Sequence, residues 1–200
     1  MVYLMTRAAR PRAVAKSGVR EDPASAYDMT HAEQAIERRT LACIVDNEPG
    51  VLARVVGLFS ARGYNIESLT VAEIDRNAHQ SRITIVTSGT DHVLEQIEQQ
   101  LLRLVPVAKV IDVTNSEGGV ERELALVKVA GKGDKRVEAL RLSEIFRARV
   151  IDTTNESFIF EITGASEKID QFCELMRDLG LVEVSRTGVL SIQRGKEKAG

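Results

Sequence analysis

Apolar and polar residues alternate with two different periods between residues 39 and 114, and each period predicts one kind of element. The apolar run 40–45 predicts a buried strand, and the positions after it have the three- and four-residue spacing of a helix. Those helical positions are Val51, Leu52, Val55, Val56, Leu58 and Phe59. Gly63 follows them, where a left-handed residue commonly ends a helix.

The rest of this stretch completes one unit of structure. Strands are predicted at 65–74, 81–87 and 107–113. A second helix is predicted from Leu94, Ile97, Leu101 and Leu104, and Pro106 ends it. The order is therefore strand, helix, strand, strand, helix, strand.

The same order recurs after the polar segment 115–120. Strands are predicted at 123–129, 150–154, 158–162, 181–184 and 189–192, and helices at 135–146 and 169–179. We therefore predict an α+β fold of two tandem ferredoxin-like (βαββαβ) domains, residues 39–114 and 121–194, joined by the linker 115–120. Right-handed crossovers place both helices of each unit on one face of an antiparallel sheet. The other face needs a cover, from the sister domain or from a second copy of the chain, so we expect a dimer.

The two ends of the chain differ from these domains. Residues 1–20 contain Arg7, Arg10, Arg12, Lys16 and Arg20 but no acidic residue, and we predict a disordered extension over residues 1–38 and a frayed tail over 195–200. An acid-poor, arginine-containing start is typical of an organellar transit peptide, but serine is scarce. A bacterial extension, or translation that begins at Met29, remains the alternative. Thr30 and Glu33 have the spacing of a capping box.

Composition and charge narrow the classes of function. The chain has 200 residues, 44% of them hydrophobic, which is enough for cores without disulfides or metals. Its net charge of −2 gives no broad field to hold a nucleic acid, and no apolar run approaches the roughly 18 residues of a membrane helix. The two cysteines, Cys43 and Cys173, fall in apolar patterns and are interpreted as buried thiols in a reducing compartment. We expect a cytoplasmic protein, or one of an organelle matrix if the extension is a transit peptide.

The turn Asn47-Glu48-Pro49-Gly50 has the chemistry to hold a small ligand. It precedes a helix whose N-terminal N–H groups attract a carboxylate, and Gly50 allows a ligand to approach the backbone closely. Asn47 carries a carbonyl oxygen and an amide, and Asn65 lies where the next strand starts. These groups would suit a free amino acid. The alternative is that Asn47 only caps the helix and Gly50 only eases a tight turn.

Other candidate sites are weaker. The segment Gly131-Lys132-Gly133-Asp134-Lys135 lacks the full phosphate-loop motif and is interpreted as a surface loop. His31, His79 and His92 have no partners at metal-ligand spacing, so no metal site is predicted. We find no set of nucleophile, base and metal ligand, and therefore predict no catalytic residue in this chain.

Three stretches carry a resemblance to a known family. The turn NEPGVL (47–52) resembles the ligand turn of ACT domains, the amino-acid-sensing modules of biosynthetic enzymes. RGYNIESLTV (62–71) and EIFRARVID (144–152), followed by Thr153-Thr154-Asn155, are similar to the small regulatory subunits of acetolactate synthase (acetohydroxyacid synthase). The resemblance covers residues 39–194 and implies that the first domain is an ACT domain.

The resemblance also implies a function and partners. Small subunits of this family are not catalytic themselves; they bind the large subunit of acetolactate synthase, activate it, and confer feedback inhibition by valine in branched-chain amino acid biosynthesis. No cofactor is expected in this chain, and thiamine diphosphate, Mg²⁺ and FAD are expected in the large subunit. ACT domains of the family pair as a homodimer with valine at the interface.

Site residues follow from the same resemblance. Asn47 and Gly50 would contact valine from one chain, with the backbone N–H groups of Val51 and Leu52 on its carboxylate. Asn65 and Ile66 would meet the same valine from the other chain. The resemblance further points to Phe146, Arg147, Arg149 and Asp152 for activation of the large subunit.

Two other classes of function are weighed against this one. A free-standing ACT-type sensor that controls transcription would need a basic helix for DNA, and the near-neutral charge argues against it. An enzyme in its own right would need the reactive residues that the sequence does not display.

Overall fold

The computed structural model describes residues 35–115 and 119–196. Most of the predicted extension 1–38, including His31 and the Thr30–Glu33 capping box, lies outside the described residues, as do the middle of the linker 115–120 and the end of the tail 195–200. The first strand begins at Glu37 and the fifth at Val120, so ordered structure enters the segments predicted as extension and linker.

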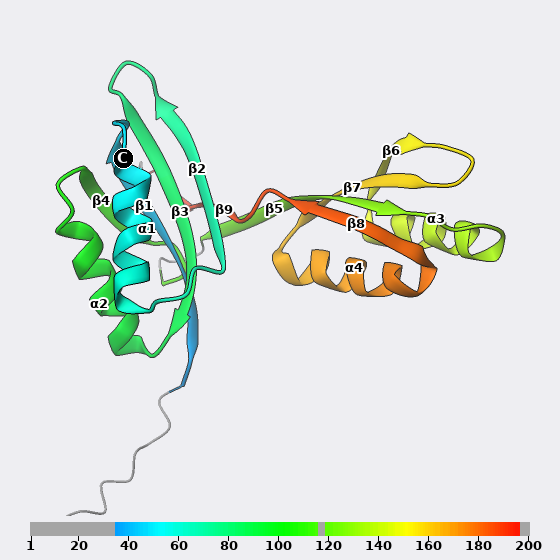
Figure 1. Ribbon diagram of the computed structural model, residues 1–200, viewed down its shortest axis with the longest axis horizontal. Coiled ribbons are helices and arrows are strands. Elements are labelled where there is room, and N and C mark those ends of the chain that lie inside the picture. The colour runs from blue at the N-terminus through cyan, green and yellow to red at the C-terminus, as the bar shows by residue number, and fades with distance from the viewer. Residues whose placement is uncertain (1–34, 116–118, 197–200) are drawn as a thin grey trace, which may run out of the picture. The chain divides into compact units, whose positions relative to one another are not determined.

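The first unit has the predicted order of elements. Its elements are β1 (Glu37–Asp46), α1 (Val51–Arg62), β2 (Ser68–Asp75), β3 (Gln80–Gly89), α2 (Asp91–Leu102) and β4 (Val107–Asp112). The sheet order is β2-β3-β1-β4 with every neighbouring pair antiparallel, which is the ferredoxin-like arrangement. Figure 1 shows α1 and α2 on the same face of this sheet. β2 is an edge strand and begins at Ser68, later than the predicted start at residue 65.

The core of this unit follows from the two periods in the sequence. Alternate β1 residues Leu41, Cys43 and Val45 point into it, and α1 contributes Val51, Val55 and Phe59 at four-residue spacing. α2 adds Leu94, Ile97 and Leu101 from the same face of the sheet. The helices are therefore held by one apolar stripe each.

The second unit repeats this arrangement with one additional strand. Its elements are β5 (Val120–Val129), α3 (Asp134–Phe146), β6 (Arg149–Thr153), β7 (Phe158–Gly164), α4 (Ser166–Gly180), β8 (Leu181–Arg186) and β9 (Leu190–Ile192). The order is β6-β7-β5-β8, and β9 pairs with the start of β5. Its core is built by Ala125, Val127, Val129, Phe160, Ile162, Ile169, Phe172 and Met176. The fold is α+β with two tandem βαββαβ units, as predicted.

The sheet faces without helices differ in how far they are covered. On the first sheet Ala42, Ile44 and Val86 are buried on that face, and the connection after β8 contacts it through hydrogen bonds to β2. The sister unit thus supplies part of the predicted cover. On the second sheet Leu126 remains 36% exposed, and it lines a shallow hollow of about 180 Å³ together with Ile159.

Candidate functional site

The turn between β1 and α1 is shaped by one left-handed residue. Gly50 is the N-cap of α1 with φ 89° and ψ −4°, a conformation that side chains disfavour. A Cβ added to Gly50 would meet no atom within 4 Å. Glycine is therefore required here by backbone conformation, and the space above it is open.

The N-terminus of α1 is open to a ligand. No side chain among the described residues caps it, so the alternative that Asn47 serves as the helix cap does not hold. The backbone N–H of Val51 donates to the carbonyl of Glu48 (3.3 Å), and that of Arg54 donates to Gly50 (3.0 Å). The first-turn N–H groups between them lack intrahelical acceptors and lie at the positive end of the helix dipole. A carboxylate bound there would satisfy them.

Asn47 is tied to the neighbouring hairpin instead. Its backbone N–H donates to the carbonyl of His79 (2.6 Å), and its side-chain amide lies 3.5 Å from a carboxylate oxygen of Glu73. Glu73 belongs to the last part of β2, and His79 to the turn before β3. The turn between β1 and α1 therefore lies beside the C-terminal end of β2.

Asn65 and Ile66 lie at the other end of α1. Gly63 ends the helix in the left-handed conformation (φ 69°), as predicted, and Asn65 and Ile66 then lead into β2. The carbonyl of Asn65 accepts a hydrogen bond from the hydroxyl of Thr87 (2.6 Å), while Ile66 packs against the core. The 12 residues of α1 span roughly 18 Å at about 1.5 Å per residue. One chain thus does not bring Asn47 and Asn65 together.

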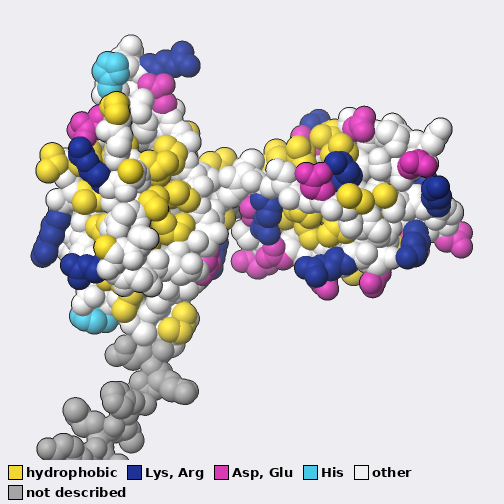
Figure 2. Space-filling model, in the orientation of Figure 1, with side chains coloured by type: hydrophobic (Ala, Val, Ile, Leu, Met, Phe, Trp, Pro, Cys, Tyr) yellow, Lys and Arg dark blue, Asp and Glu magenta, His cyan; other side chains and the backbone are white. Residues whose placement is uncertain are grey.

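Exposed apolar side chains lie between these two ends. Figure 2 shows a patch of them over α1 and the neighbouring β2. The exposed apolar residues of the two elements are Leu52, Val56, Val71 and Ile74, with exposed fractions between 37% and 48%. The edge position of β2 beside an apolar patch favours a protein partner at this position.

The residues expected to act on the large subunit lie at the junction of α3 and β6. Phe146 packs its ring 5.3 Å from that of Phe172, so its side chain supports the core. Arg147 ends α3 in the left-handed conformation (φ 55°), which is unusual for a residue with a side chain. The exposed Arg149 pairs with Glu161 at 2.8 Å, and Asp152 is exposed near the end of β6. Arg147, Arg149 and Asp152 therefore remain accessible on one short segment.

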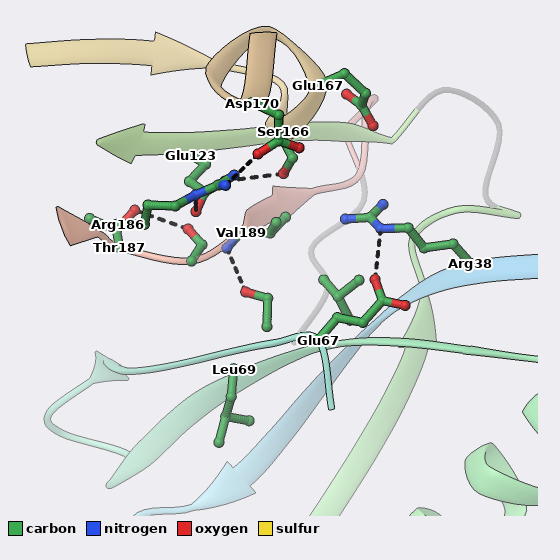
Figure 3. A pocket seen from close by; sticks show the side chains of 13 residues that line it. Arg38, Glu67, Leu69, Glu123, Ser166, Glu167, Asp170, Arg186, Thr187 and Val189 are labelled. Atoms are coloured by element: carbon green, nitrogen blue, oxygen red, sulfur yellow. Dashed lines mark hydrogen bonds and ion pairs between the residues drawn. The ribbon is translucent and has the colours of Figure 1, made fainter. Parts of the chain in front are cut away.

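A charged cavity of about 640 Å³ was not foreseen from the sequence (Figure 3). On one side Arg38 lies 3.4 Å from Glu67, and on the other Arg186 binds both carboxylate oxygens of Glu123 at 2.5 and 2.8 Å. Burial alone would raise the pKa of the Glu123 carboxyl, but the hydrogen bonds and charge of Arg186 outweigh it and hold that pKa below its usual range. A signal existed in the sequence, because Glu123 stands in the inward period-two series of β5.

Among the described residues, no group of three or more His, Cys, Asp and Glu side chains is arranged to hold a metal ion. Within the same ranges, no helix is long and apolar enough to cross a membrane.

Comparison with known proteins assigns both units. Residues 41–109 match the family model of the AHAS small subunit-like ACT domain, and residues 122–195 match that of the small subunit of acetolactate synthase. The probable acetolactate synthase small subunit of Archaeoglobus fulgidus is 48% identical over 161 residues, which is 80% of this chain and 99% of that protein. The acetolactate synthase isozyme 3 small subunit of Escherichia coli K12 is 48% identical over 159 residues, 79% of this chain and 96% of that protein.

A solved structure agrees with these relatives. The crystal structure of the acetolactate synthase small subunit from Thermotoga maritima superposes with a TM-score of 0.72 at 40% sequence identity. The similarity covers 80% of this chain and 99% of that one.

Proposed function

The chain belongs to the family of acetolactate synthase small subunits, and from this premise we propose that it is a non-catalytic regulatory subunit that activates the large subunit and makes it sensitive to valine. The large subunit would hold the thiamine diphosphate, Mg²⁺ and FAD. The observation that carries the proposal is the uncapped N-terminus of α1 beside an exposed apolar patch, inside a domain of amino-acid-sensing type.

Each group of a free amino acid has a counterpart at this position. The carboxylate would accept hydrogen bonds from the backbone N–H groups of Val51 and Leu52. The ammonium would donate to the side-chain carbonyl oxygen of Asn47 or Asn65, since an asparagine amide offers both an acceptor and donors. A short branched side chain such as that of valine would pack against Leu52 and Ile66.

The site would be completed by a second copy of the chain. Asn47 lies beside the C-terminal end of β2, whereas Asn65 and Ile66 precede its N-terminal end. If two copies pair antiparallel along the exposed edge of β2, the turn of one copy meets residues 65 and 66 of the other. Such a homodimer through the ACT domains would also cover the apolar patch. Each ligand would then contact both chains, so valine binding would report on their mutual arrangement.

Regulation then requires only a difference in affinity. Valine need only bind one arrangement of the dimer better than the other, because a ligand shifts an equilibrium by its differential affinity. A typical coupling free energy of about 1–3 kcal/mol would change activity roughly 5- to 150-fold. The partner contact for activation would include Arg147, Arg149 and Asp152, whose side chains are accessible, with Phe146 holding α3 in place.

The test is acetolactate formation by the cognate large subunit, with and without this protein, across a valine titration. Asn47→Ala is expected to retain stimulation and to lose most of the inhibition, because the ammonium loses an acceptor. Gln99→Ala is the control, since it removes an exposed side-chain amide from α2, away from the proposed site, together with one further methylene. Stimulation that valine reverses supports the proposal, and an Asn47→Ala variant as valine-sensitive as Gln99→Ala would contradict the site. An absence of any effect on the large subunit would instead favour a free-standing sensor.

A further inference from the structure

The connection between β8 and β9 is hydrogen-bonded to the start of β2. The backbone N–H of Val189 donates to the hydroxyl oxygen of Ser68 (2.9 Å), and the hydroxyl of Thr70 donates to the carbonyl of Val189 (3.1 Å). Val189 is 3% exposed, so both hydrogen bonds are shielded from water. Figure 3 shows the hydrogen bond from the backbone N–H of Val189 as a dashed line.

Gly188 makes this close approach possible. Its φ of 82° lies in the left-handed region, and an added Cβ would lie 2.7 Å from the hydroxyl oxygen of Ser68 and 2.9 Å from the methyl carbon of Thr70. Glycine is therefore required both by the backbone conformation and by the neighbouring strand. The contact of Gly188 and Val189 with Ser68 and Thr70 is called the β2 clasp below.

The clasp is anchored firmly on the second sheet. The backbone N–H of Thr187 donates to the carbonyl of Leu124 (3.0 Å), and the Leu124 N–H donates to the Thr187 hydroxyl (3.1 Å). Arg186, the preceding residue, is held by the buried carboxylate of Glu123. A displacement of the clasp would therefore strain these hydrogen bonds and move β5 and β8 with it.

A second link lies beside the clasp. The guanidinium of Arg38 on β1 lies 3.4 Å from Glu67 and 3.3 Å from Glu121 on β5. Glu67 and Ser68 directly follow Asn65 and Ile66, the residues proposed to meet the effector from the second copy. A shift of residues 65 and 66 would therefore also move Glu67 and Ser68, which form the ion pair with Arg38 and the hydrogen bond with Val189.

We propose that the β2 clasp transmits the effector signal from the first unit to the second, by changing its contacts when residues 65 and 66 engage the ligand. The inference rests on the proposed valine-sensing function. Physically, two arrangements of β2 relative to Gly188 and Val189 must differ in free energy, and the ligand biases them through its different affinity for each. Without the clasp, the first unit would still bind the effector, but this binding would no longer inhibit the large subunit.

The test compares Gly188→Ala with Gly195→Ala in the full-length protein. Gly195 also has a left-handed backbone (φ 101°), but an added Cβ there meets no atom within 4 Å, so the control shares the strain and lacks the collision. Valine binding is measured by calorimetry on the small subunit alone, and inhibition is measured after reconstitution with the large subunit. Gly188→Ala is expected to bind valine with nearly unchanged affinity, but saturating valine is expected to inhibit it about tenfold less strongly than it inhibits Gly195→Ala, within the range of typical allosteric couplings.

If Gly188→Ala folds and valine inhibits it as strongly as it inhibits Gly195→Ala, the proposed role of the clasp is wrong. If Gly188→Ala does not fold, the double variant Ser68→Ala/Thr70→Val decides, because these changes remove the two hydrogen bonds with little change in side-chain shape. Unchanged inhibition in that double variant would equally overturn the inference. Failure of the proposed function looks different, since the unaltered protein itself would then neither bind valine nor transmit inhibition.

Discussion

Replacing Arg186 by methionine should destabilise the second unit by isolating a buried charge. The Glu123 side chain is 4% exposed, and both of its carboxylate oxygens are bonded to Arg186. Methionine preserves much of the side-chain length but donates no hydrogen bond. The Ser166 hydroxyl (3.1 Å) and the backbone N–H of Gly188 would remain as donors to the carboxylate. Glu123 would then be an anion that has lost its cationic partner in a low-dielectric setting.

The expected loss in the free energy of unfolding follows from how far Arg186 and Glu123 are exposed to water. Breaking a fully buried ion pair from one side typically costs about 3–5 kcal/mol. Because the Arg186 side chain is 34% exposed, part of its interaction with Glu123 is already screened by water. We therefore expect a loss of about 2–3 kcal/mol in the free energy of unfolding at pH 7. Arg177→Met, which breaks the exposed pair with Glu174, should cost at most about 0.5 kcal/mol.

The effect of Arg186→Met on folding stability should depend on pH, with a definite sign. In the unaltered protein the pKa of Glu123 is lower in the folded state than in the unfolded state, so its contribution to stability is present above the unfolded pKa and is lost as pH falls through the folded pKa. Without Arg186, burial dominates and raises the pKa of Glu123, so the variant relieves its isolated charge by taking up a proton. The stability difference between the two proteins should therefore shrink as pH falls from 7 to 4.

Urea unfolding at pH 7, 5.5 and 4 measures this difference directly. Adding Glu123→Gln to Arg186→Met should recover part of the lost stability at pH 7, because a neutral amide costs less to bury than an unpaired carboxylate. A loss below about 1 kcal/mol at pH 7, or a difference that stays constant down to pH 4, would refute the assignment of Glu123 as a buried, paired anion.

Three further outcomes are expected from single residues. Gly180→Ala should lower the free energy of unfolding by about 2–4 kcal/mol, because the new Cβ overlaps the carbonyl of Ala130 at a φ of 104°. Gly57→Ala, in the middle of α1 with open space around it, should instead raise it by about 0.5–1 kcal/mol in the same urea assay. In thiol labelling at pH 8, Cys43 should react only after unfolding, because burial raises its pKa to about 12. Cys173 is only half-buried and should be labelled first, so equal rates in the native protein would contradict this ordering.

The helices and strands of the fold can be predicted from local patterns in the sequence. The three- and four-residue spacing of Val51, Val55 and Phe59 predicts α1, and the alternation of Phe158, Phe160 and Ile162 predicts β7. Both patterns were confirmed, because each element buries one face and local periodicity records which face that is. The turn before α1 was also predicted locally, since the left-handed conformation of Gly50 favours glycine, while its role in ligand binding stays a prediction.

The contacts that join distant parts of the chain were decided by tertiary structure. Arg186 meets Glu123, and Val189 meets Ser68, across 63 and 121 residues of sequence. No short-range pattern encodes which polar side chain a buried carboxylate will find, because that pairing depends on the order of the strands and on the register between them. The same holds for the separation of Asn47 from Asn65, where the length of α1 keeps the two residues apart within one chain.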